Sequence, residues 1–180
     1  MKNTAPFLLF FVTLMVAACA GPVTMAPLGS SPEIQAEAQR QQEMLFKKYI
    51  QDQDRLFNIA HPVLTANESF CQQKSPAVGF TAWNIYTIGA KYRSAAKGVY
   101  NMQDRLAVQF VADGGPAARA NIRSGDFILA VNGQNVPPGP DALKIAARLL
   151  DQAGYDTSRI VLERNGRQIN TRLTPARGCD

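Results

Sequence analysis

Side chains that could act as acids, bases, nucleophiles or metal ligands are few in this chain and lie far apart. The single histidine, His61, stands next to Pro62 in a stretch with helical spacing. The sequence has no cluster at metal-ligand spacing and no Gly-x-Ser-x-Gly turn of the kind that holds a nucleophilic serine. Its isolated acids fall at predicted turns and helix starts, where Asp caps backbone amides: Asp104, Asp113, Asp126 and Asp141. We therefore predict no catalytic residue, no metal site and no cofactor, and we interpret His61 as a structural or surface residue.

The first of three cysteines, Cys19, follows an apolar run that begins at Ala5 and ends at Ala18, with Lys2 before it. The run is shorter than the roughly 20 residues of a membrane-spanning helix and is typical of a signal peptide. Its end, V-A-A-C, resembles a bacterial lipobox, in which small residues precede the cleavage site and the cysteine sulfur takes a diacylglycerol. This resemblance implies a lipoprotein signal peptide over residues 1–18 and lipidation of Cys19. An ordinary secretory signal with a chance cysteine is the alternative.

The predicted anchor also indicates a location. A diacylglycerol on Cys19 together with an N-terminal acyl chain such as palmitate gives more than one lipid, which makes attachment to a membrane stable. Ala20, not Asp, follows the cysteine. By resemblance to lipoprotein sorting rules, this favours the outer membrane, with the protein facing the periplasm, over retention in the inner membrane.

The remaining cysteines, Cys71 and Cys179, form an even pair in a chain expected in an oxidising compartment. Such a pair predicts a disulfide, which in the chain-entropy model would stabilise the fold by about 4–5 kcal/mol before strain is subtracted. Two separate free thiols are the alternative.

Charge and composition exclude several classes of partner. Hydrophobic residues make up 46% and charged residues 18% of the 180 residues, as in a globular domain with a core. The net charge is +5, but the basic residues are scattered and no aromatic-interleaved basic stripe appears. We therefore expect no binding of nucleic acid.

The chain divides into a tether, a helix and a domain. Residues 19–31, rich in Gly, Pro and Ser, form a flexible lipidated tether. Ser31, Pro32 and Glu33 are typical of a helix start, and the segment 32–68 is predicted to be helical until Pro62 kinks or ends it. A long coiled coil is not expected, because the apolar repeat does not persist over three heptads.

From Ala77 onward the pattern changes to short strands separated by turns. We predict strands over 80–88, 106–111 and 126–131, an amphipathic helix over 140–153, and two hairpins at Asn132-Gly133 and Asn165-Gly166. Residues 69–180 are expected to fold as one α+β domain.

The segment from Gly114 to Gly133, G-G-P-A-A-R-A-N-I-R-S-G-D-F-I-L-A-V-N-G, resembles the core signature of PDZ domains. Pro116 suits the entry of a short helix, and Gly125-Asp126 makes a tight turn into a strand. Asn121 stands where the family usually has Gly. The resemblance extends over residues 77–175 and implies a PDZ-like small β-sandwich or barrel with two helices, preceded by the long N-terminal helix.

PDZ domains bind an extended peptide, usually a C-terminus, as an added strand beside a helix. By this resemblance, a carboxylate-binding loop falls at Ala77, Val78, Gly79 and Phe80, just after Lys74. The pairing edge falls at Thr81 and Trp83, and the wall of a side-chain pocket at Ala142, Ile145, Ala146 and Leu149. Plain strand for the loop and ordinary core for the helix residues are the alternatives. A small apolar C-terminal residue is the expected ligand end.

A broader resemblance links residues 56–71, the PDZ-like domain and the ending Gly178-Cys179-Asp180 with the non-catalytic front part of PDZ-containing zinc metallopeptidases. Their His-Glu-x-x-His motif does not occur in this sequence. Three hypotheses follow for the chain, which is not expected to be an enzyme. In the first, it is a lipid-anchored peptide- or protein-binding module. In the second, it is a truncated or auxiliary partner of an envelope metallopeptidase. In the third, it is a structural protein with an empty groove.

Overall fold

The computed structural model describes residues 31–179, and the predicted signal peptide and most of the tether lie outside this range. One compact unit, Glu37–Asp180, contains most of the long helix together with the whole domain. No helix within the described residues is long and apolar enough to cross a membrane.

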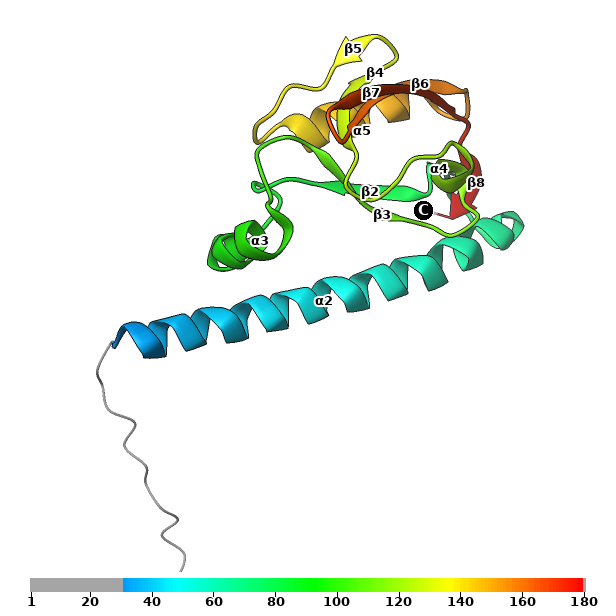
Figure 1. The fold of residues 1–180 in the computed structure, drawn as a ribbon. Helices are drawn as coiled ribbons and strands as arrows, with labels where there is room; N and C mark the ends of the chain where they lie inside the picture. Colours follow the sequence, from blue (N-terminus) through cyan, green and yellow to red (C-terminus); the bar gives the residue numbers. More distant parts are fainter. Residues whose placement is uncertain (1–30, 180) are drawn as a thin grey trace, which may run out of the picture. The chain divides into compact units, whose positions relative to one another are not determined.

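The elements alternate short strands with helices, as expected for an α+β domain (Figure 1). The helices are α2 (Pro32–Ala66), α3 (Arg93–Tyr100), α4 (Pro116–Arg119) and α5 (Ala142–Ala153), with short 3-10 turns at Glu68–Phe70 and Ala90–Tyr92. The strands are β1 (Lys74–Ala77), β2 (Phe80–Trp83), β3 (Ala107–Val111), β4 (Phe127–Val131), β5 (Gln134–Asn135), β6 (Ser158–Arg164), β7 (Arg167–Leu173) and β8 (Ala176–Cys179).

The long helix begins where the sequence predicts, with the Ser31 hydroxyl accepting the N–H of Ile34 at 3.3 Å. Of the two alternatives predicted for Pro62, a kink or an end of the helix, the end is wrong, because α2 continues through Pro62 to Ala66. Only one helical turn follows Pro62, so the proline affects few of the backbone hydrogen bonds of α2. The Thr65 hydroxyl donates to the His61 carbonyl at 2.9 Å, and the Asn67 side chain donates to the Val63 carbonyl at 2.8 Å.

The main sheet is antiparallel, with strand order β2-β3-β4-β6-β7 and β5 paired to β4. Its two predicted hairpins are present. Asn132 and Gly133 have φ of 51° and 80°, and Asn165 and Gly166 have φ of 51° and 73°. These left-handed values match the twist of the flanking strands, which is why Asn-Gly pairs occur there.

Alternation along the strands builds the main core. Residues 158, 160 and 162 of β6 are buried while their neighbours are more exposed. Of these, Ile160 and Leu162 join Leu106, Val108, Ile128 and Leu173 and the buried face of α5 in one hydrophobic cluster. Gly154, with φ of 56°, ends α5 as predicted.

A separate ladder joins the two ends of the domain. β1 pairs antiparallel with β8, from Lys74 opposite Cys179 to Ala77 opposite Ala176. Beside this ladder Cys71 and Cys179 are disulfide-bonded, as expected, with Cα atoms 5.5 Å apart across a sequence separation of 108. β1 and β8 were not predicted, since neither segment shows strand periodicity by itself.

The predicted strand over 80–88 is only half present, because β2 ends at Trp83. The Asn84 side-chain oxygen accepts the N–H groups of Tyr86 (3.0 Å) and Thr87 (3.3 Å), which turns the chain out of the sheet. The insert that follows carries the unpredicted helix α3. Ala95 and Ala96 of α3 pack with Phe46 and Ile50 of α2 and with Trp83, Met102 and Phe110 in a second core cluster.

Candidate peptide-binding groove

The predicted loop forms a tight turn between β1 and β2. The Val78 carbonyl accepts the N–H of Ala117 at 3.1 Å, and the Gly79 carbonyl accepts the N–H of Ala112 at 2.9 Å. No acceptor for the N–H groups of Val78 and Gly79 is found within residues 31–179. Buried backbone amides are nearly always paired, so two adjacent free amides at a partly enclosed turn suit the carboxylate of a ligand.

Gly79 is required by this turn for two reasons. Its φ of 76° lies in the left-handed region, which side chains with a Cβ disfavour. A Cβ on Gly79 would also lie 2.9 Å from Cδ of Pro116 and 3.3 Å from Nε2 of His61. The loop is therefore held from behind by the start of α4 and by the end of α2.

His61, interpreted from the sequence as structural, packs against this loop. Its Nε2 atom is buried and has no hydrogen-bond partner among the described residues. Burial lowers the pKa of His61 below its usual value, and the positive charge of Arg119 lowers it further. These surroundings disfavour the protonated form of the ring, which packs against the loop from α2.

β2 lies at the end of the sheet and pairs, among the described strands, only with β3. Its side chains alternate: Phe80 and Ala82 pack in the main core, while Trp83 belongs to the second cluster. The Thr81 hydroxyl accepts the N–H of Phe110 at 3.2 Å. The side chains of Phe80, Ala82 and Trp83 therefore pack in the two cores, and the unpaired backbone edge of β2 remains available to a ligand strand.

Most of the predicted pocket wall is core. Ala142, Ala146 and Leu149 are only 1%, 3% and 3% exposed. Ile145 is partly buried against the same cluster, and it also lines an open hollow of about 380 Å³ beside α5. Of the four predicted helix residues, Ile145 is thus the one with surface left for a ligand side chain.

Asn84 fixes the end of the groove and was not singled out by the sequence. This side chain is 1% exposed. Its amide nitrogen donates to the carbonyls of Gly139 (2.8 Å) and Asp104 (3.0 Å). Gly139 precedes α5, so one side chain at the end of β2 ties the start of α5 to the edge strand. The available signal was an asparagine in the middle of the predicted strand 80–88, since asparagine is disfavoured in strands.

Lys74, just upstream of the loop, is already paired. Its ammonium lies 2.6 Å from a carboxylate oxygen of Glu68, and hydrogen bonding to Lys74 lowers the pKa of Glu68. Lys74 therefore anchors the start of β1 to the 3-10 turn after α2, and it is not free to meet a ligand carboxylate in this arrangement.

Asp126 stabilises a turn, as predicted, and also forms a buried ion pair. It is 1% exposed and accepts the N–H of Arg123 at 2.8 Å. Arg164 donates to both of its oxygens, at 2.6 and 2.7 Å, and to the carbonyl of Asn121 at 2.7 Å. Asn121 has φ of 56°, so it takes the left-handed turn at the position where the family usually has Gly.

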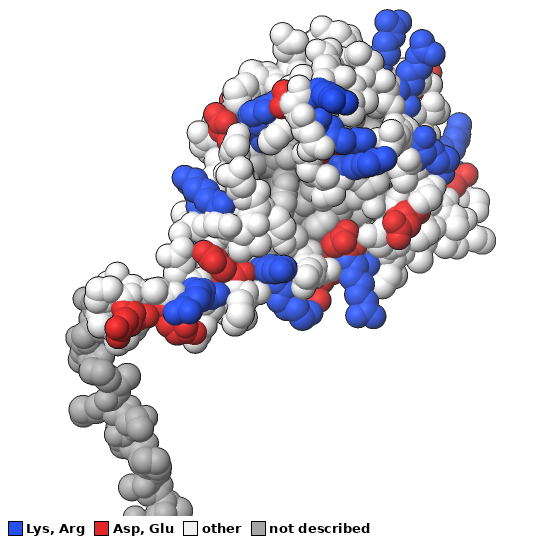
Figure 2. All heavy atoms as spheres, viewed as in Figure 1, with Lys and Arg blue, Asp and Glu red and all other residues white. Residues whose placement is uncertain are grey.

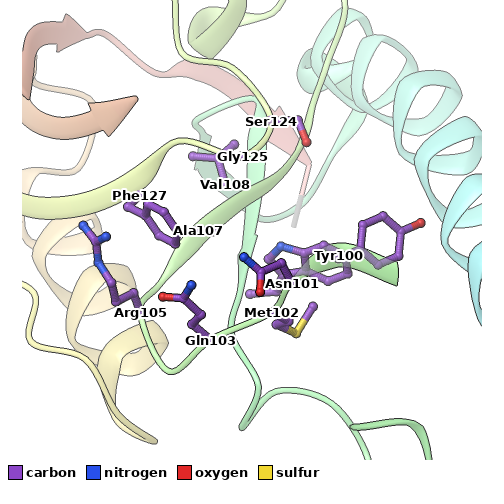
Figure 3. Close-up of a pocket in the computed structure, with 11 residues that line it drawn as sticks. Tyr100, Asn101, Met102, Gln103, Arg105, Ala107, Val108, Ser124, Gly125 and Phe127 are labelled. Atoms are coloured by element: carbon purple, nitrogen blue, oxygen red, sulfur yellow. The ribbon is translucent and has the colours of Figure 1, made fainter. Parts of the chain in front are cut away.

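A small pocket of about 140 Å³ lies on the other side of β3, toward α3 (Figure 3). Its lining includes Tyr100, Met102, Arg105 and Phe127, and Arg105 stacks over the Phe127 ring at 4.0 Å. Of the predicted site residues only Trp83 contributes to it. Apart from Trp83 of the predicted pairing edge, the lining of this pocket lies outside the predicted groove.

Charge does not single out a binding face. Acidic and basic side chains are interspersed on the face shown in Figure 2, and neither sign covers it alone. No group of three or more His, Cys, Asp or Glu side chains among residues 31–179 is arranged to hold a metal ion. Cys19, the predicted lipidation site, lies outside the described residues.

Comparison with known families identifies the domain. Residues 110–164 match the family model of the PDZ domain. A curated relative, the serine protease Do-like HtrA of Lactobacillus helveticus, is 30% identical over 98 residues, which are 54% of this chain and 23% of the relative. The match therefore spans about a quarter of that protease's length. The chain contains a PDZ domain, a module that is not itself catalytic.

Solved structures to which the chain is similar include a protease and an isolated domain. A serine endoprotease from Yersinia pestis is 23% identical, with 58% of this chain and 29% of that chain covered and a TM-score of 0.38. The PDZ domain of HtrA3 bound to a phage-derived ligand is 16% identical, with 58% and 88% covered and a TM-score of 0.42.

Proposed function

We propose, from the PDZ domain that the chain contains, that the protein is a lipid-anchored binding module of the bacterial envelope that takes up peptide or protein C-termini. The ligand adds as an antiparallel strand to the free edge of β2 and lies beside α5. The observation that carries this proposal is the pair of unpartnered amides at Val78 and Gly79, immediately before that edge.

Each part of the groove then has a defined task. The amides of Val78 and Gly79 hold the ligand carboxylate through charge-assisted hydrogen bonds. The β2 backbone pairs with the ligand backbone, and Ile145 contacts an apolar side chain near the ligand end. Lys74 stays with Glu68, so affinity for the carboxylate rests on the loop amides.

Anchoring and location are part of the same proposal. The lipobox at Cys19 supports attachment to the outer membrane facing the periplasm, where the Cys71–Cys179 disulfide would persist. Mass spectrometry of the mature N-terminus tests the anchor, since diacylglycerol on Cys19 adds a defined mass. An unmodified cysteine, or cleavage elsewhere, would overturn it.

The binding test uses the full-length chain and fluorescent peptides with apolar C-termini, measured by anisotropy. Free-acid peptides should bind and their amidated copies should not. Along a bound peptide, N-methylation should weaken binding at every second amide only, because alternate amides face the β2 edge. Equal binding of acids and amides, or no alternation, would refute strand addition at this site.

A pair of glycine variants locates the site. Gly79→Ala introduces a Cβ at positive φ and against Pro116, so it should distort the loop and lower peptide affinity. Gly133→Ala is the control: it has a similar φ of 80°, but a Cβ there meets nothing within 4 Å and lies in the β4–β5 turn. Both variants should lose about 1–2 kcal/mol of stability, and only the first should lose binding.

A second function is favoured by one observation, the 30% identity to a protease of the Do-like HtrA type. In this alternative the PDZ domain is an auxiliary part that presents substrates to an envelope protease encoded separately, either a serine protease or the zinc metallopeptidase that the sequence resemblance implied. Crosslinking in cells followed by purification tests it. Recovery of a protease that depends on an intact groove would favour this reading, and its absence would leave the stand-alone module.

A further inference from the structure

The side of α2 that faces away from the domain carries an unusual row of exposed apolar side chains. Leu45 is 70% exposed, Tyr49 57%, Leu56 57%, Ile59 56% and Val63 55%. Single exposed apolar residues are ordinary, but a contiguous row along one helix marks an interaction surface. We call these residues, with Asp52 between them, the outer stripe.

The outer stripe is distinct from the face that holds α2 on the domain. Phe46 and Ile50, 3% and 7% exposed, pack in the second core cluster with Phe57 beside them. At 3.6 residues per turn the two faces lie roughly 120° apart around the helix. A partner on the outer stripe would therefore not compete with the domain, and it would find α2 already held in a helical state.

The spacing of the outer stripe fits a second helix of the same kind. Positions 45, 49, 52, 56, 59 and 63 alternate steps of four and three residues, the repeat of a coiled-coil seam. These steps read the same from either end. An antiparallel copy therefore sets Leu45 against Val63, Tyr49 against Ile59 and Asp52 against Leu56 of the other chain, with every apolar residue covered.

Charge distinguishes the two possible directions. In a parallel pair the two Asp52 carboxylates would meet in the seam, which costs free energy through like-charge repulsion. In the antiparallel pair each Asp52 instead lies beside Arg55 of the other chain, so two carboxylates and two guanidiniums gather at the centre. Within one chain, Asp52 pairs among residues 31–179 only with Lys48, in an exposed contact.

We propose that the outer stripe is a self-association surface on which two copies of this chain pair through antiparallel α2 helices. The stripe from Leu45 to Val63 is about 27 Å long at 1.5 Å per residue. An interface of this length falls at the weak, transient end of protein–protein contacts. Dimers should therefore form in the micromolar range, and more fully where copies are concentrated on one membrane.

Sedimentation equilibrium of the full-length chain in detergent tests the proposal over about 1–200 μM. The weight-average mass should rise from monomer towards dimer across this range. Ile59→Lys should raise the dimer Kd by at least about 100-fold, because it sets an unpaired ammonium from each chain against Tyr49 of the other chain in the seam. Gln51→Lys adds the same charge to the exposed helix surface outside the stripe and should leave the Kd within about twofold.

A charge exchange tests the direction. Asp52→Arg should raise the Kd by about tenfold, and adding Arg55→Asp to it should restore dimers. A single cysteine at Gln53, near the symmetry centre, should crosslink to itself, whereas one at Leu45 should not. A monomer at all concentrations, a dimer that survives Ile59→Lys, or self-crosslinking at Leu45 would each overturn the proposal.

Discussion

Removing the Asn84 side chain should weaken the attachment of the start of α5 to the edge strand β2. Asn84→Ala deletes four hydrogen bonds at once: two donated to the carbonyls of Asp104 and Gly139, and two accepted from the amides of Tyr86 and Thr87. Each net bond is worth about 1 kcal/mol. Water can reach part of the surroundings, so we expect a loss of about 2–4 kcal/mol in the free energy of unfolding.

Urea unfolding with the disulfide intact measures this loss. Asn170→Ala is the matched control, because Asn170 is exposed on β7 and its side chain forms no recorded hydrogen bond among the described residues. That control should change stability by less than about 0.5 kcal/mol. Peptide affinity gives a second readout, since a looser α5 should weaken binding to the β2 edge.

Asn84→Asp adds a test of the mechanism. The carboxylate keeps the two accepted bonds but turns a negative charge towards two carbonyl oxygens in a buried place. The pKa of the new carboxyl should therefore be raised in the folded state, and the deficit of this variant relative to the natural protein should shrink as the pH falls through that pKa. A loss below about 1 kcal/mol for Asn84→Ala, or a pH-independent deficit for Asn84→Asp, would refute the reasoning.

Three further perturbations follow from the structure. Arg164→Met leaves the Asp126 carboxylate buried without its partner, so urea unfolding should show a loss of about 3–5 kcal/mol; a loss under 1 kcal/mol would contradict a buried pair. Replacing Cys71 and Cys179 together with Ala should cost up to about 4–5 kcal/mol, seen as a lower midpoint in urea, and an unchanged midpoint would mean that the disulfide does not form. Because the folded pKa of His61 lies below 6.5, the unfolded chain takes up the proton first, and stability should fall as the pH drops below about 6.5. His61→Gln should remove this component between pH 7 and 5, and identical pH profiles would contradict it.

The sequence located the elements whose signals are local. Asn132-Gly133 and Asn165-Gly166 predicted hairpins because these residues tolerate positive φ, and both turns are present. Residues 140–153 predicted a helix from its amphipathic period and its terminal glycine, and α5 occupies 142–153. The Gly-Asp turn and the Pro-Ala-Ala helix start identified the PDZ domain before any long-range contact was known.

Segments governed by distant partners could not be placed in the same way. The strand expected over 80–88 stops at Trp83, because Asn84 bonds to the backbone ahead of it and to Gly139. β1 exists only because it pairs with β8 at the far end of the domain. α3 is held by α2 and by Trp83 of the edge strand, contacts that no window of sequence contains.

The site shows the same division. The resemblance to PDZ domains placed a loop at Gly79, with plain strand as the alternative, and the structure has a turn there, with a φ of 76° that glycine adopts readily. Tertiary packing decided which residues beside Gly79 remain available to a ligand. Three of the four predicted α5 residues are buried in the core, and Lys74 is paired with Glu68. Likewise, only the packing of Phe46 and Ile50 against the domain distinguishes the buried face of α2 from its exposed face. Local conformational preference is encoded in neighbouring residues, whereas burial depends on which surfaces meet, and only the folded chain settles that.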